Sequence, residues 1–177
     1  MRAIVEAARD LNYPCEIVCV VSNRPEAGGL EYARSQNIVA HAIDHKSFTS
    51  REEFDSALDN YLQTQNLDFI VCAGFMRIMT TVLIKPWESR MINIHPSLLP
   101  LYRGLHTHER AISAGDKEGG CTVHYVTAEL DDGPIIAQAR VPIFKNDTPE
   151  TLAERVLVEE HKLYPAALAK VASAKNI

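Results

Sequence analysis

The chain contains the stretch Met91-Ile92-Asn93-Ile94-His95-Pro96-Ser97, whose alternation of side chains predicts a β-strand. The two isoleucines fall on one face of this strand, and Asn93 and His95 fall on the other, about 6.6 Å apart along it. Pro96 has no N–H to offer a sheet ladder, so we expect the strand to end at His95. Parallel sheets place their ligands at this end of a strand, which makes both polar residues candidates for a site.

Five more apolar runs bounded by turn residues lie on either side of this stretch, at positions 16–21, 38–43, 69–72, 121–126 and 134–143. The first four runs of the chain, 91–94 included, alternate with stretches of helical period. Such alternation predicts an α/β fold, a doubly wound, Rossmann-like and mostly parallel sheet with helices on both faces. The last two runs are joined only by the turn Asp131-Asp132-Gly133-Pro134, which predicts a C-terminal antiparallel hairpin.

Two helix starts are marked by capping residues. Ser50 and Glu53 form a capping box, in which each side chain would accept from the backbone N–H of the other residue. Thr148-Pro149-Glu150 supplies an N-cap hydroxyl, a first-turn proline and an acid at the positive end of a second helix. We expect that helix to run to about Leu163, where Pro165 breaks or kinks it.

The bulk composition limits the class of protein. A chain of 177 residues, 46% hydrophobic and 23% charged, predicts one domain over residues 1–177. The net charge of -5 disfavours nucleic-acid binding, which depends on neutralising phosphates. We expect no contact with membranes and a cytoplasmic protein, because the chain shows neither a membrane-length apolar run nor a signal peptide. The four cysteines form no CxxC pair and predict buried thiols in a reducing compartment.

Asn93, His95 and Asp131 together would suit acyl transfer to an amine. An amide and an imidazole can donate to the oxyanion of a tetrahedral intermediate, where one donor contributes about 3–4 kcal/mol. Asp131 follows a strand that carries His124, and a carboxylate there could help to move the proton that the attacking amine loses. The plain alternatives are that Asn93 and His95 cap a strand end and that the Asp131 turn is ordinary turn chemistry. The chain has no GxSxG elbow, so direct attack by the amine is the simpler scheme.

Four motifs, in this order, carry a resemblance to a known family: residues 93–100 (NIHPSLLP), 104–108 (GLHTH), 123–126 (VHYV) and 130–134 (LDDGP). Together they resemble the folate-dependent formyltransferases, and the GLHTH run is similar to the phosphoribosylglycinamide formyltransferase branch in particular. The resemblance covers nearly the whole chain. It implies an enzyme that transfers a formyl group from 10-formyltetrahydrofolate to the amine of 5-phosphoribosylglycinamide in de novo purine biosynthesis.

The resemblance also implies roles for individual residues. Asn93, His95 and Asp131 match the catalytic trio of the family, and Pro96 and Glu160 match residues that line or bind the glycinamide substrate. Positions that match folate-contacting residues are Arg51, Met76, Arg77, Ile78, Met79, Asn93, Thr127, Ala128, Glu129, Leu130 and Asp131. No metal is implied, and a zinc site at His106 and His108 is disfavoured because their side chains diverge before a helical run.

Each carried-over role has an ordinary alternative. Met76, Ile78 and Met79 would be core residues in most proteins, Arg51 a solvated surface arginine, and Glu160 part of the wet face of a long helix. The family's phosphate-holding loop, a Gly-Asn-Gly-Ser-Asn-like run after its first strand, has no counterpart here, because Met1 falls inside the helix that would follow it. If no residues precede Met1, we expect a sheet that lacks one strand and exposes a hydrophobic edge.

Other functions stay open. The run Tyr102-Arg103-Gly104 also resembles the methionyl-tRNA formyltransferases, and a formyltetrahydrofolate hydrolase is a further alternative. Both would be expected to carry an additional domain. A non-catalytic folate-binding module is the alternative from another class. The sequence leaves open whether the chain acts as a monomer or as a homodimer.

Overall fold

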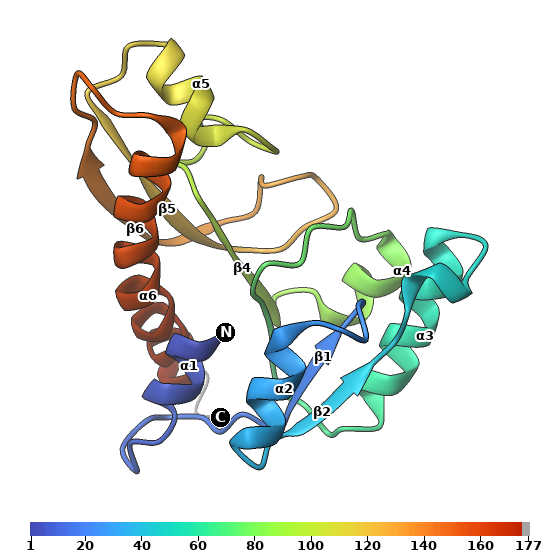
Figure 1. Cartoon of the computed structure of the whole chain (residues 1–177). Helices are drawn as coiled ribbons and strands as arrows, with labels where there is room; N and C mark the ends of the chain where they lie inside the picture. Colours follow the sequence, from blue (N-terminus) through green and yellow to red (C-terminus); the bar gives the residue numbers. More distant parts are fainter. Residues whose placement is uncertain (175–177) are drawn as a thin grey trace.

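The computed structural model describes residues 1–174 and folds them as an α/β protein with two sheets (Figure 1). The strands are β1 (Cys19–Ser22), β2 (Val39–Ala42), β3 (Ile70–Cys72), β4 (Met91–His95), β5 (Glu118–Tyr125) and β6 (Ile135–Pro142). The helices are α1 (Arg2–Ala7), α2 (Gly28–Ser35), α3 (Arg51–Gln63), α4 (Thr81–Ile84), α5 (Thr107–Ser113) and α6 (Pro149–Ala174), with 3-10 turns η1 (His45–Ser47) and η2 (Lys85–Trp87).

The strand pairing confirms the predicted α/β class, but the number of sheets differs from the prediction. β1 pairs in parallel with β2, and β3 pairs in parallel with β4, as expected for strands joined through helices. β5 runs antiparallel to both β4 and β6, so the second sheet has the order β3-β4-β5-β6. The two sheets are separate in the described part of the chain, whereas the sequence pattern predicted a single sheet.

Helices cover both faces of the larger sheet. Met91 packs on one face with apolar residues of α3 and α4, and Ile92, the next residue, packs on the other face against α1 and α6. This opposition follows from the alternation of side chains along β4. Figure 1 shows α1 lying against α6 on that second face. The helices thus hold β4 in place with its last residue, His95, at the end where the candidate site begins.

The start of α3 differs from the predicted capping box in one bond. The Ser50 hydroxyl accepts from the backbone N–H of Glu53 at 3.1 Å, as expected. The Glu53 carboxylate reaches one residue further back than predicted, to the backbone N–H of Thr49 at 2.9 Å and to its hydroxyl. Both bonds hold that carboxylate in its ionised form and lower its pKa.

The prediction that the last helix ends near Leu163 was wrong, because α6 continues through Pro165 to Ala174. A proline inside a helix costs about 3 kcal/mol. Beyond it, Leu168 and Val171 are 2% and 5% exposed, and burying each such side chain stabilises the fold by about 1.5–3 kcal/mol. Burial of the second half of the helix therefore outweighs the cost of the proline.

The cysteines are all free thiols, but only two of them are buried as predicted. Cys72 and Cys121 are buried, and burial raises the pKa of each thiol to about 12. Cys15 and Cys19 are only half-buried, because they line an open space between β1 and β3. Within residues 1–174, no helix is both long and apolar enough to cross a membrane.

Candidate active site

The structure brings His95 and Asp131 into direct contact. His95 is the last residue of β4, and Asp131 lies in the loop between β5 and β6 with a φ of 50°. The His95 Nδ1 atom lies 3.3 Å from the Asp131 Oδ2 atom, and the two side chains are 8% and 10% exposed. In so little solvent, an interaction between opposite charges is screened far less than at the surface.

The second ring nitrogen of His95 defines where protons lie in this pair. Its Nε2 atom is 3.0 Å from the backbone carbonyl of Tyr102, which can only accept a hydrogen bond. Nε2 must therefore carry a proton. The Nδ1 atom faces the Asp131 carboxylate, so a proton on either group would lie in a hydrogen bond between them. Such a pair is equipped to take up or release a proton during a reaction.

The loop of residues 101–106 holds Asp131 in place. The backbone N–H of Gly104 donates to Asp131 Oδ2 at 2.9 Å. Gly104 has a φ of 77°, a conformation that glycine adopts without steric cost. Arg103, the residue before Gly104, forms an ion pair with Asp132 at the surface. The same loop thus supplies both the Tyr102 carbonyl for His95 and the amide for Asp131.

Asn93 connects to the pair through His124, a buried residue of β5 that lies opposite it in the sheet. The Asn93 amide nitrogen is 3.4 Å from His124 Nε2, and the other ring nitrogen, Nδ1, is 2.8 Å from the Tyr125 carbonyl. Nδ1 therefore carries the proton, and Nε2 accepts from Asn93. Burial lowers the pKa of His124. Although Asp131 Oδ1 lies 3.7 Å from Nε2, we conclude that this histidine is neutral near pH 7 and that the contact is not an ion pair.

The segment after β3 begins beside the trio, because Cys72 is paired with Asn93 in the sheet register. Met76 is 78% exposed and Ile78 is 56% exposed, so the core alternative is wrong for these two residues. Met79 does pack on the core formed with α3 and α4. The Arg77 guanidinium lies 5.2 Å from the centre of the Phe54 ring, a cation–π contact that anchors the segment. Exposed apolar side chains on an anchored loop beside polar groups are typical of a ligand site.

The other positions expected to contact folate lie on two exposed segments. Arg51 occupies the first turn of α3 and is exposed. Ala128, Glu129 and Leu130 are exposed, with Leu130 at 55%, and the Thr127 hydroxyl lies 3.2 Å from the Glu129 carbonyl. The loop that carries these residues leads directly into Asp131.

The two positions expected to contact the glycinamide substrate lie on different elements. Pro96 follows His95 directly, and Glu160 lies in the middle of α6. Glu160 is half-buried, and this burial raises its pKa, so it does not lie on a fully solvated helix face. Its electrostatic neighbours include the Met1 amino group and the Cys121 thiol. No hydrogen bond or ion pair joins it to the trio within residues 1–174.

A third histidine, His108 of α5, interacts electrostatically with His95. Burial, and secondarily that neighbour, lower the pKa of His108. In the part of the chain that is described, no group of three or more His, Cys, Asp or Glu side chains could hold a metal ion.

Sequence reasoning did not assign three groups that the structure places at the site: the Tyr102 carbonyl, the Gly104 amide and the His124 ring. Two of them are backbone groups, whose direction depends on the path of the loop and leaves no mark on residue type. One feature of the sequence could have indicated that His124 belongs to the site. This histidine stands in a strand expected to lie next to the strand of Asn93, with its side chain on the face of a polar partner.

Comparison with known proteins gives a consistent result. The formyl transferase family matches residues 1–168. Phosphoribosylglycinamide formyltransferase of Escherichia coli is 41% identical over 175 residues, which are 99% of this chain and 82% of that protein. The human trifunctional purine biosynthetic protein adenosine-3 is 43% identical over 173 residues, 98% of this chain and 17% of that protein. The chain thus spans only a small part of the trifunctional relatives.

Solved structures show the same fold. Phosphoribosylglycinamide formyltransferase from Brucella melitensis superposes with a TM-score of 0.92 at 50% identity, covering 97% of this chain and 88% of that one. Glycinamide ribonucleotide transformylase 1 from Symbiobacterium toebii superposes with a TM-score of 0.94 at 42% identity, covering 98% of this chain and 82% of that one. At these identities the likeness extends beyond the fold to the sequence.

Proposed function

The chain belongs to the formyl transferase family, and from that premise we propose that it transfers a formyl group from 10-formyltetrahydrofolate to the amine of 5-phosphoribosylglycinamide in de novo purine biosynthesis. The observation that carries the proposal is the buried contact of His95 with Asp131, at the end of a strand that also presents Asn93. These are the three side chains that direct acyl transfer to an amine requires.

In the proposed reaction, the amine nitrogen bonds to the formyl carbon, and the bond from that carbon to the folate nitrogen breaks. Negative charge develops on the formyl oxygen, where the Asn93 amide N–H and a His95 N–H donate. To reach that oxygen, His95 exchanges its 3.0 Å bond to the Tyr102 carbonyl for one to the substrate. Before substrate arrives, that bond holds the donor in position, which lowers the cost of organising the site.

Asp131 handles the proton in this scheme. The attacking amine loses one proton and the departing folate nitrogen gains one, so the site must relay a proton without a net change. The carboxylate lies 3.3 Å from His95 Nδ1 and is fixed by the Gly104 amide. It can therefore accept the amine proton and return it, a role that typically contributes about 10²–10⁴ in rate.

The folate is proposed to lie across the segment after β3 and the loop before Asp131. Met76, Ile78 and Leu130 expose apolar side chains there that a pteridine ring would cover. Arg51 and Arg77 offer positive charge to the carboxylates of the folate tail. On the glycinamide side, Pro96 and Glu160 are the proposed contacts, and a half-buried acid such as Glu160 suits an amine or hydroxyl ligand. Four free cysteines fit a reducing, cytoplasmic setting.

The test is turnover of the chain with 10-formyltetrahydrofolate and 5-phosphoribosylglycinamide, followed by absorbance as the folate loses its formyl group. Turnover that requires both substrates supports the transferase. Folate binding without turnover would support a non-catalytic folate-binding module. Folate deformylation without an acceptor amine would support a hydrolase, and turnover only with methionyl-tRNA would support a tRNA formyltransferase.

A pair of variants separates mechanism from folding. Asn93→Ala removes the amide proposed to meet the oxyanion, and we expect kcat to fall by about 10²–10³. Asn146→Ala makes the same chemical change at an exposed residue between β6 and α6 and should leave kcat unchanged. Undiminished turnover in Asn93→Ala would refute the role of that side chain even if the enzyme were active.

A further inference from the structure

Asp55 of α3 is a buried carboxylate that the proposed mechanism does not use. It is 2% exposed, and it is the one acidic residue in the core of the part of the chain that the structure describes. Burying a carboxyl group costs free energy unless hydrogen bonds compensate for the lost water. One Asp55 oxygen, Oδ2, accepts from the backbone N–H of Thr80 at 2.5 Å. The cost of breaking this bond therefore keeps Thr80 against α3.

Thr80 follows the segment of residues 73–79, which is proposed to lie against the folate. The segment starts at the end of β3, where Cys72 is held opposite Asn93 in the sheet. It ends at the first turn of α4, which lies beside α3 (Figure 1). The Thr80 hydroxyl has no hydrogen-bond partner in the described chain, so it does not fix this end. The two ends of the segment are thus held by the sheet and by Asp55.

The side chains of the segment alternate between the protein and the solvent, as they do along an extended chain. Phe75 stacks on the Phe54 ring with centres 6.5 Å apart, and the Arg77 guanidinium lies over the same ring. The residues between and after them, Met76 and Ile78, are 78% and 56% exposed. A slip of one residue would exchange the two sets and turn the exposed apolar side chains away from a ligand.

The Asp55 bond fixes this register more strictly than the ring contacts do. Phe54 and Asp55 are neighbours on α3, so both hold the same segment. Aromatic and cation–π contacts tolerate a range of offsets between the two groups. A hydrogen bond instead needs its donor and acceptor close together and roughly in line. Because the N–H that meets the Asp55 oxygen is that of Thr80, the bond selects one register for the residues before it.

A second aspartate on α3 makes a similar bond away from the folate segment. Asp59 lies one turn after Asp55, and its Oδ1 atom accepts from the indole N–H of Trp87 at 2.7 Å. Trp87 belongs to η2, beyond α4, and is 1% exposed. The two aspartates therefore tie α3 to opposite ends of the stretch from α4 to η2. Only the bond from Asp55 adjoins the segment proposed to contact the folate.

We propose that Asp55 is a positioning residue for the folate, which acts through the Thr80 N–H to keep Met76 and Ile78 facing the pteridine ring. It also fixes these side chains relative to Arg51, the proposed contact of the folate tail, which lies one turn before it on α3. A segment that is already in place spares the folate the cost of ordering it on binding. The inference rests on the proposed function and adds a residue that acts on affinity rather than on chemistry.

The test is calorimetric titration of the chain with 10-formyltetrahydrofolate in the absence of the acceptor amine. Asp55→Ala removes the acceptor of the Thr80 N–H. A tenfold change in equilibrium is the order of one hydrogen bond, so we expect about one tenth of the variant to keep the segment in place and the folate Kd to rise about tenfold. In steady-state formyl transfer, the folate KM should rise in parallel while kcat stays within about twofold, because Asn93, His95 and Asp131 are unaltered.

Further variants separate positioning from general stability. Asp55→Asn keeps an oxygen that can accept from Thr80 and should hold the folate Kd within about threefold of the unsubstituted chain. Asp59→Ala is the matched control, because it removes an acceptor of the same kind from the same helix. It should lower Tm by about 2–4 °C through loss of the Trp87 bond and leave the folate Kd within about twofold. If Asp55→Ala does not fold, Asp55→Ser replaces it, since a serine hydroxyl ends one bond short of the carboxylate oxygens.

Four results would overturn the proposal: an unchanged folate Kd in the folded Asp55→Ala or Asp55→Ser protein, an equal rise of Kd in Asp59→Ala, no recovery of affinity in Asp55→Asn, or a fall in kcat that exceeds the rise in Kd. An unsubstituted chain that binds no folate would refute the proposed function and this inference together. Binding that the loss of the Asp55 carboxylate leaves unchanged would refute this inference alone, so the two failures are distinguishable.

Discussion

Replacing Asp131 by Asn isolates the charge that the proposed mechanism places beside His95. The substitution keeps the size of the side chain and an oxygen that can still accept from the Gly104 amide. It removes the negative charge 3.3 Å from His95 Nδ1. Whenever the His95 ring is protonated, unit charges at that separation attract by about 5 kcal/mol at an effective dielectric constant of about 20, part of which desolvation offsets. We therefore expect kcat to fall by about 10²–10⁴, with a much smaller change in KM for the folate.

The assay is steady-state formyl transfer, with thermal unfolding measured in parallel to confirm that the variant is folded. Asp132→Asn is the matched control, since it lies on the same turn and its carboxylate is 44% exposed in a surface pair with Arg103. Exposed ion pairs contribute at most about 1 kcal/mol, so this control should retain turnover within about fivefold. A folded Asp131→Asn protein with the kcat of the unsubstituted chain would refute the proton-relay argument.

Three further variants test individual hydrogen bonds in the fold. His124→Phe removes the ring nitrogen that orients Asn93 at 3.4 Å, and kcat should fall by about tenfold, the equivalent of one hydrogen bond. The same variant should flatten the dependence of stability on pH below about 6.5, measured by urea unfolding. Burial lowers the pKa of His124, so the unfolded chain binds its proton first and stability falls as pH drops through that window. Tyr164→Phe removes bonds of 2.6 Å to the Cys72 carbonyl and 3.1 Å to the Ile92 carbonyl, and the free energy of unfolding should drop by about 1–3 kcal/mol in the same assay. Ser50→Ala should cost about 1 kcal/mol through loss of the α3 N-cap.

The parts of the fold that depend on local patterns could be predicted from the sequence. β4 ends at His95 because Pro96 follows it, and α3 begins after Ser50 because that hydroxyl caps it. The end of α6 could not be predicted in the same way. The free-energy cost of Pro165 inside the helix is a local effect. The burial of Leu168, which outweighs that cost, depends on which face of the sheet the helix covers.

The same distinction between local and long-range effects applies to the candidate site. The alternation in β4 places Asn93 and His95 on one face, but their meeting with Asp131 depends on a loop that folds back over the end of the strand. At Gly133 that loop approaches the backbone so closely that a Cβ would lie 1.8 Å from the Tyr125 carbonyl oxygen. Long-range approaches of this kind leave little trace in spacing, so the sequence made Asp131 a candidate partner but could not place it against His95.

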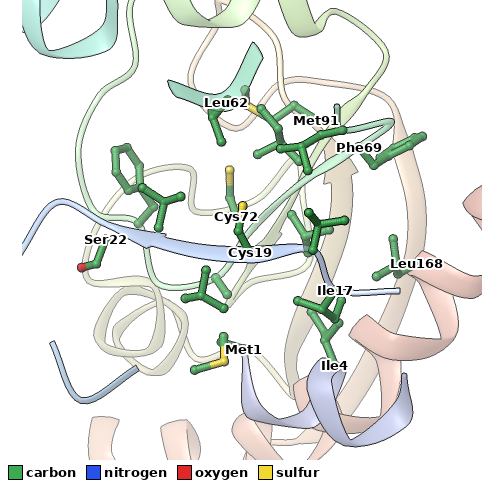
Figure 2. A pocket seen from close by; sticks show the side chains of 18 of the residues that line it. Met1, Ile4, Ile17, Cys19, Ser22, Leu62, Phe69, Cys72, Met91 and Leu168 are labelled. Carbon is green, nitrogen blue, oxygen red and sulfur yellow. The ribbon is translucent and has the colours of Figure 1, made fainter. Parts of the chain in front are cut away.

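The number of sheets could not be predicted from local patterns. The sequence pattern predicts one sheet, whereas the structure has two, separated between β1 and β3. Cys15 and Cys19 are half-buried because both line the space between these strands (Figure 2).

The most direct test of the account follows the formyl carbon itself. With 10-formyltetrahydrofolate labelled with carbon-13 at the formyl group, nuclear magnetic resonance reports where that carbon goes in the presence of the chain and 5-phosphoribosylglycinamide. We predict that the label appears as an N-formyl group on the glycinamide amine and that Asn93→Ala slows its appearance. Label released as formate, or label that stays on the folate while the folate binds, would contradict the claim that Asn93, His95 and Asp131 act on one formyl carbon for transfer to an amine.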